Sequence, residues 1–410
     1  MLPLCFQLPH LTAQTPTRLS AFQSVRDSLG ATTDTNQLRT ELKALRRSDP
    51  LRAGLVALRL GELGGDPGFS EALSSFRRAS RGAHPAEAWY GLGLAETGRS
   101  EWEMRNPLSL GSRVGLGALE RAASDYIQAI RAEPGFVPPA VALAEVTLAL
   151  LDTARTRTAR DALRRASAVL PVRLPELLLA RGRIERAAGS LDSAGVIFEG
   201  YLAAGGDRAL GLLELGRTRL AAGRADGEAA YYEGASLQDD EATAGYRADL
   251  ALVADTSDLN EFDHLRGMAR VAHLRRFWTD RDHWELRAEG ERLREHYRRL
   301  VFAWTHFPLT ISRRYYGRRD AYRSGNHEID DRGIIYLRHG DPDQRLRPFV
   351  FGTMPNESWH YRRAEGDLFF HFTAGYDRNG GGDLYDYRLV QSILDLHGAD
   401  DAPIDQLLLS

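Results

Sequence analysis

A pattern of small and aromatic residues, spaced four and then three positions apart, recurs between residues 55 and 240. The last members of the final three sets are 35 and 34 residues apart. A period of this length is typical of stacked helical hairpins, because no single hairpin can bury its own apolar face. We therefore expect an α-helical array over residues 51–254. The five sets are Ala72/Phe76/Ala79, Ala122/Tyr126/Ala129, Ala159/Leu163/Ala166, Ala194/Phe198/Tyr201 and, shortened by one residue, Ala229/Tyr232/Ala235.

The composition is that of a soluble globular protein and excludes several classes of partner. The 410 residues are 43% hydrophobic and 27% charged, and the formal net charge is only −3. So small a charge gives no overall field that would attract nucleic acid, and no nucleic-acid partner is expected. The single cysteine, Cys5, excludes an internal disulfide and a thiolate metal cluster. We expect no cofactor, no metal and no membrane span.

The N-terminal residues carry a possible export signal. Residues 1–13 are apolar and resemble the end of a secretory signal, with cleavage after Ala13. This favours an extracytoplasmic protein, periplasmic or secreted; a loosely packed terminus on a cytoplasmic protein is the alternative. Residues 14–50 form a mixed N-terminal segment, with a helix expected from Gln37 to Arg47.

Within the array, the landmarks of one repeat resemble those of the tetratricopeptide family. Proline follows the closing residue of three sets, where a helix should stop, and glycine recurs in the preceding helices, where it allows close helix packing. The resemblance implies a helical solenoid. One departure is an excess of about 17 residues between Gly93 and Ala122, which predicts an insertion at 99–117 between the two helices of that repeat. The matching landmarks, in order, are Trp89, Leu92, Gly93, Ala122, Tyr126, Ala129 and Pro134, and the recurring glycines are Gly61, Gly93, Gly182 and Gly216.

Residues 255–410 differ in composition and predict a second domain. They hold ten of the twelve histidines and four of the six tryptophans. Helical periodicity covers 264–277 and 284–307, and short aromatic or β-branched runs follow at 333–338, 358–362, 368–372 and 384–389. Glu365-Gly366-Asp367 would join two of these runs as a hairpin. We expect two helices packed on a small, mostly antiparallel sheet, so the whole chain is a helical solenoid followed by a small α+β domain.

The second domain resembles the GWxTD proteins, a bacterial family of unknown biochemistry. The motif that names the family is degraded, since residues 327–331 read His-Glu-Ile-Asp-Asp and keep only its final aspartate. The resemblance implies a fold and a frequent extracytoplasmic setting more than an activity. The matching segments are Phe277-Trp278, Arg281-Asp282, 295–307, 331–336, 339–343 and 357–361.

The leading functional hypothesis is a non-enzymatic interaction or scaffold protein that binds a partner segment on the concave face of the repeats. Apolar and arginine side chains together suit a peptide that has apolar anchors and an acidic group, because arginine holds a carboxylate with two hydrogen bonds. In the tetratricopeptide register, the residues expected to face this groove are Tyr90, Leu94, Leu179, Arg183, Arg186, Leu213, Arg217 and Leu220.

The alternative hypothesis is an enzyme or small-ligand receptor with its site in the C-terminal domain. Carboxylates and imidazole are the groups that acid–base chemistry and hard metals use, although Asp-Pro-Asp is equally good turn chemistry. Neither H-E-x-x-H nor G-x-S-x-G occurs, and the sequence leaves the oligomeric state open. The residues of this alternative site are Asp331, Arg332, His339, Asp341, Asp343, Glu357 and Trp359.

Overall fold

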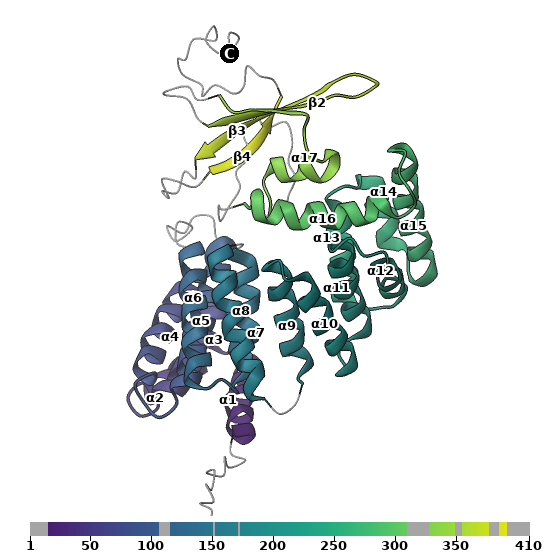
Figure 1. The fold of residues 1–410 in the computed structure, drawn as a ribbon. Helices are drawn as coiled ribbons and strands as arrows, with labels where there is room; N and C mark the ends of the chain where they lie inside the picture. Colours follow the sequence, from purple (N-terminus) through teal and green to yellow (C-terminus); the bar gives the residue numbers. More distant parts are fainter. Residues whose placement is uncertain are drawn as a thin grey trace, which may run out of the picture. The chain divides into compact units, whose positions relative to one another are not determined.

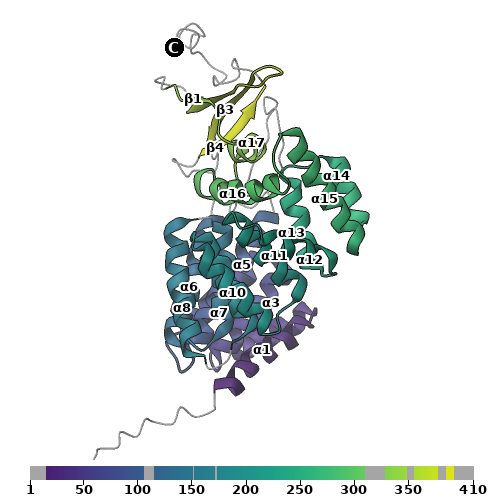
Figure 2. The same cartoon turned by 45° about the vertical axis from the view of Figure 1, so that its right-hand side comes forward.

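The computed structural model describes residues 15–105, 115–150, 152–170, 173–309, 328–348, 355–376 and 385–391. The chain forms two compact units, shown with their elements in Figures 1 and 2. The first contains residues 1–107, 117–143 and 165–170, and the second contains 108–116, 144–164 and 171–410. The predicted signal remnant, 1–13, lies outside the described residues. In the described ranges, every helix is too short or too polar to span a bilayer.

The described residues up to 306 are mainly helical, and aspartate side chains fix several of the helix starts. Asp34 and Asp49 each accept backbone N–H groups at the start of the helix that follows, which satisfies donors without an intrahelical partner. The predicted helix near 37–47 is thus confirmed as α2. The helices here are α1 (Thr15–Gly30), α2 (Thr35–Leu45), α3 (Pro50–Gly64), α4 (Asp66–Ala79), α5 (Pro85–Arg105), α6 (Gly115–Ala132), α7 (Val137–Leu150) and α8 (Thr153–Val169).

The recurring sets lie on every second helix, as a hairpin array requires. They fall on α4, α6, α8, α10 (Leu191–Ala203) and α12 (Gly227–Ser236), and their members are buried in the first four sets. α9 (Pro175–Ala187) packs on α10, and α11 (Arg208–Ala221) packs on both α10 and α12. The pattern therefore predicted correctly that these residues form the buried faces of α-helices.

Glycine in the first helix of a hairpin makes room for the large residue of the set. A Cβ atom on Gly93 would lie 2.2 Å from Cε1 of Tyr126, and one on Gly182 would lie 2.5 Å from Cε1 of Phe198. Contacts this short do not occur between real atoms, so only glycine fits at these two positions.

Two details of the predicted array differ from the structure. In the fifth set Ala229 is exposed, and the four-then-three spacing is kept by the buried residues Gly227, Tyr231 and Gly234. The expected insertion at 99–117 is wrong at both ends, because residues 99–105 continue α5 and residues 115–117 begin α6. Residues 106–114 lie outside the described part.

The second unit continues with five more helices and a sheet around one hydrophobic core. This core runs from Ala209 to Phe372, so residues on both sides of position 255 share it. α15 packs on α12, and α16 packs on α11. The elements are α13 (Asp240–Ala251), α14 (Thr256–His264), α15 (Gly267–Trp284), α16 (Glu291–His306), α17 (Asp331–His339), β1 (Gln344–Leu346), β2 (Asn356–Tyr361), β3 (Leu368–Tyr376) and β4 (Tyr385–Val390).

The four strands form an antiparallel sheet in the order β1-β2-β3-β4. This confirms a small antiparallel sheet near the C-terminus and the hairpin at 365–367, which joins β2 to β3. Trp359, Tyr361 and Phe372 point from one face of the sheet into the core. α17 packs against β4 and against α16 (Figure 1).

The segment 333–338, predicted as a strand, is the helix α17. Its apolar run is short and continuous, and such a run does not distinguish a strand from a buried helix. The residues at the two ends of the segment favour a helix. The Asp330 side chain accepts the N–H groups of Arg332 and Gly333, and Gly340 ends the helix with φ +79°. The sheet is therefore covered by α17, not by the two longer helices that the sequence suggested.

Candidate ligand-binding cavity

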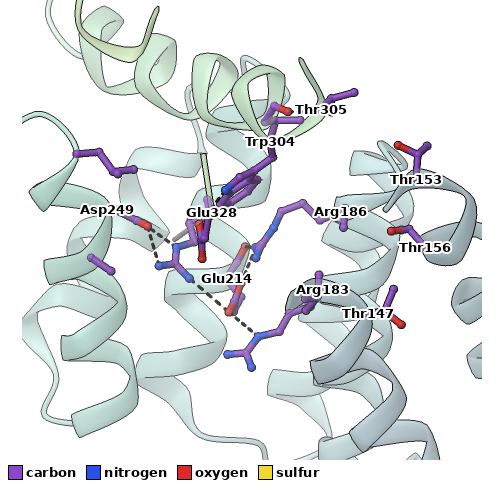
Figure 3. Close-up of a pocket in the computed structure, with 16 residues that line it drawn as sticks. Thr147, Thr153, Thr156, Arg183, Arg186, Glu214, Asp249, Trp304, Thr305 and Glu328 are labelled. Atoms are coloured by element: carbon purple, nitrogen blue, oxygen red, sulfur yellow. Dashed lines mark hydrogen bonds and ion pairs between the residues drawn. The ribbon is translucent and has the colours of Figure 1, made fainter. Parts of the chain in front are cut away.

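A cavity of about 500 Å³ lies in the second unit (Figure 3). Helices α9, α11 and α13 supply its charged side chains except Glu328, which precedes α17, and α16 closes one side with Val301, Trp304 and Thr305. Thr147 of α7 and Thr153 and Thr156 of α8 also line the cavity. The polar lining residues are Thr147, Thr153, Thr156, Arg183, Arg186, Glu214, Arg217, Asp249, Trp304, Thr305 and Glu328.

Three arginines meet around one buried glutamate, which organises the cavity. Glu214 Oε1 lies 2.8 Å from Arg183 Nε and 3.5 Å from Arg217 Nη1, and its Oε2 lies 2.5 Å from Arg186 Nη1. Burial alone would raise the pKa of Glu214, but the charges of Arg186, Arg217 and Arg183 lower it to about 2. The carboxylate is therefore ionised at any physiological pH.

Arg217 is held in place by a second acid. Its Nε and Nη2 donate to the two carboxylate oxygens of Asp249 at 2.7 and 2.9 Å, and Nη2 also donates to the Gly245 carbonyl at 3.0 Å. Tyr297 of α16 donates its hydroxyl to Asp249 Oδ2 at 2.7 Å. This network joins α11, α13 and α16, and it makes Arg217 a fixed wall of the cavity.

Arg183 is the most available of the three cations. Its side chain is 25% exposed, and its Nη2 donates at 2.8 Å to Glu241, which is itself 60% exposed. Its Nη1 has no hydrogen-bond partner among the described residues. The buried Oγ1 of Thr147, which also lines the cavity, likewise lacks one within the described ranges. The cavity thus presents polar atoms that a bound group could satisfy.

Apolar groups and an indole complete the lining. Leu148, Leu252 and Val301 supply apolar surface. Trp304 donates its ring N–H to Glu328 Oε2 at 2.9 Å, so the ring is fixed at the wall. A mixture of guanidinium groups and apolar surface suits a ligand that carries both a carboxylate and an apolar part.

The structure brings together three of the eight residues predicted for the groove. Arg183, Arg186 and Arg217 line the cavity, but Tyr90, Leu213 and Leu220 are core residues, and their assignment to the groove was wrong. Tyr90 packs against the rings of Phe22, Tyr126 and Phe136 because its helix turns that face into the first unit's core. Leu94 is half-buried in the first unit, and Leu179 is half-buried against the core of the second.

The sequence did not reveal the acidic partners or the α16 wall. Glu214 lies between leucines in the sequence Leu-Leu-Glu-Leu on α11. A charged residue flanked by leucines in this way could have indicated a buried ion pair. Asp249, Trp304 and Glu328 gave no comparable signal, since they reach the cavity from elements distant in sequence.

The alternative C-terminal site is only partly assembled. Arg332 Nη1 lies 3.1 Å from Glu357 Oε2, and Trp359 donates to Glu357 Oε1 at 2.6 Å. Asp331 accepts the backbone N–H of Leu389 at 2.9 Å, which ties β4 to α17. These contacts hold the sheet on α17.

The other three predicted residues of that site lie apart from this group. His339 is at the far end of α17 against the rings of Tyr361 and Phe370; burial, then Arg363, lowers its pKa to about 4. Asp341 is 75% exposed and pairs with Arg345, and Asp343 accepts a backbone N–H. The seven residues therefore do not form the single site that was predicted. Across the described ranges, no His/Cys/Asp/Glu group is arranged to hold a metal.

Comparison with family models, with curated proteins and with solved structures gave no match.

Proposed function

We propose that this protein is a non-enzymatic interaction protein that binds a short acidic segment of a partner protein in the cavity around Arg183. In this account the helical hairpins are tetratricopeptide-like repeats, and α16 forms one wall of the binding site. The observation that carries the proposal is the state of Arg183: one side of its guanidinium is fixed by buried Glu214, and the other is held only by exposed Glu241.

The distribution of charge supports an acidic ligand. Glu214 is 1% exposed and the Asp249 side chain 10%, so these acids lie beneath the guanidinium groups that they orient. A ligand therefore meets the N–H donors of Arg183 and Arg186, together with the exposed carboxylate of Glu328, which is hydrogen-bonded to Trp304. A ligand carboxylate can take the place of Glu241 on Arg183 at little cost, because an exposed ion pair contributes only about 0–1 kcal/mol.

The size and apolar part of the cavity indicate how much of a partner it holds. A volume of about 500 Å³ lies within the range of small-ligand pockets, so it admits a few side chains but no long segment. Leu148, Leu252 and Val301 offer a surface for an apolar side chain next to the acid. A partner would thus insert a short motif that combines one carboxylate with one or two apolar groups.

Fluorescence polarisation with labelled pentapeptides tests this proposal. Each peptide combines apolar residues with one Asp or Glu, and each has an Asn or Gln counterpart of the same shape. We expect the acidic members to bind and Arg183→Gln to weaken them about tenfold or more, since a charge-assisted pair is lost. The matched control is Arg208→Gln, which removes an exposed arginine paired with Glu233 outside the cavity. Equal binding of acidic and amide peptides, or equal loss in both variants, would contradict the proposal.

The setting of the protein is a second part of the proposal. The apolar residues 1–13 and the resemblance of 277–361 to GWxTD proteins support an extracytoplasmic location. Cell fractionation of the native organism tests it: recovery with the periplasmic or secreted proteins is expected, and recovery only in the cytosol would contradict it.

A further inference from the structure

The turn between α15 and α16 has a backbone conformation that its sequence does not favour. Leu286 has φ +53°, and among the described residues it is the one non-glycine with a positive φ. The turn ends α15 with the paired hydrogen bonds of a Schellman motif, from Arg287 N to Asp282 O at 2.8 Å and from Leu286 N to His283 O at 3.2 Å. Glycine is the usual residue at this position, because a Cβ atom there is sterically strained.

The same turn exposes two large apolar side chains. Leu286 is 95% and Trp284 is 89% exposed, the highest values for large apolar residues in the part of the chain described. Neither side chain gains from packing in the fold, and Leu286 adds backbone strain. A strained residue with no structural benefit points to a function, and tryptophan is enriched at the centres of protein interfaces.

The charges around this turn, here called the tip (residues 284–290), indicate what it meets. Residues 280–291 hold five carboxylates and two arginines, which disfavours an anionic membrane surface. Glu289 is exposed and has no ion pair within the described residues. The tip thus offers two apolar side chains and one available carboxylate, which is the combination that the cavity around Arg183 suits.

We propose that the tip of one copy of this chain inserts into the cavity of a second copy; this inference rests on the function proposed above. Trp284 and Leu286 meet the apolar wall, and Glu289 pairs with Arg183. Reciprocal insertion closes as a two-fold dimer, in which each copy gives a tip and receives one. Both surfaces belong to the second unit, so each chain carries a complete pair.

Sedimentation velocity of the full chain over a range of micromolar concentrations tests the proposal. We expect the wild type to dimerise reversibly. Trp284→Ala, Leu286→Gly and Arg183→Gln should each weaken the dimer about tenfold or more, because each substitution removes a contact at both of the two equivalent interfaces of a two-fold dimer. The control Met268→Ala removes another exposed apolar side chain of α15 and should leave the dimer unchanged. Leu286→Gly relieves the strained turn, so its loss of dimer cannot be attributed to unfolding.

Two results would overturn the inference. One is a wild type that stays monomeric at all concentrations, or a dimer that survives the tip substitutions. The other is a dimer that needs the tip but tolerates Arg183→Gln, since the receptor would then lie elsewhere. Peptide binding to the Trp284→Ala variant distinguishes failure of the dimer from failure of the proposed function. If acidic peptides bind at Arg183 although the wild type stays monomeric, the proposed function stands and only the self-association is refuted.

Discussion

Replacing Glu214 by glutamine should destabilise the second unit strongly, because three guanidinium groups surround this one buried carboxylate. The pKa of Glu214 falls from 4.5 to about 2 on folding, since Arg186, Arg217 and Arg183 outweigh the effect of burial. Each pKa unit corresponds to about 1.4 kcal/mol, so the charged form contributes about 3 kcal/mol to stability. Glutamine keeps the shape and part of the hydrogen bonding and removes the charge.

The assay is urea unfolding at neutral pH, followed by tryptophan fluorescence, because four of the six tryptophans lie beyond residue 260. In the wild type, the stabilisation by ionised Glu214 is fully present above about pH 4.5, because its pKa is lower in the folded than in the unfolded state. It should be lost as the pH falls from about 4.5 toward 2. Glu214→Gln should not show this loss. The control Glu233→Gln breaks an exposed pair with Arg208 and should change stability by less than about 1 kcal/mol. If Glu214→Gln were as stable as the wild type, the arginines would not depend on the carboxylate and the reasoning would fail.

Three further substitutions test other parts of the fold. Burial and, after it, the charge of Arg292 hold the pKa of His296 well below 6.5. As the pH falls below about 6.5, the wild type should therefore lose stability relative to His296→Phe by about 1.4 kcal/mol per pH unit. Urea unfolding at several pH values measures this, and free energies of unfolding that change equally with pH in both proteins would contradict it. Gly182→Ala should destabilise by about 1–3 kcal/mol, whereas Gly195→Ala, which meets no atom within 4 Å, should stabilise by about 0.5–1 kcal/mol; equal melting temperatures would refute the close packing. Leu286→Gly should raise the free energy of unfolding by about 1 kcal/mol, and a lower value would show that the turn is unstrained.

The helical hairpins could be predicted because their signal is local. A small residue, a large residue four positions later and a small residue three further on lie on one helical face, so spacing alone marks the buried stripe. Tyr126 and Phe198 occupy the large positions, and the glycines opposite them, Gly93 and Gly182, were correctly identified as sites of close approach. The strand prediction at 333–338 failed because its outcome depended on the cap residues Asp330 and Gly340 and not on periodicity.

The candidate site could be predicted only in part, for the same reason. Arg183, Arg186 and Arg217 follow from helical register, but which acids neutralise them depends on how helices pack. Glu214 contacts all three arginines, but only its contact with Arg217, three residues later on α11, can be predicted from spacing. Trp304 comes from α16, more than a hundred residues after Arg183, so only the folded chain shows that the cavity has a wall there.

The affinity of one acidic pentapeptide for the wild type, Arg183→Gln and Glu241→Gln tests the central claim most directly. Glu241 holds the exposed side of Arg183, so its neutralisation should free that guanidinium and tighten binding several-fold, while Arg183→Gln should weaken it about tenfold or more. Opposite changes in the two variants are the predicted result. If Glu241→Gln weakens binding or leaves it unchanged, the ligand carboxylate does not replace Glu241 on Arg183, and the proposed site is wrong.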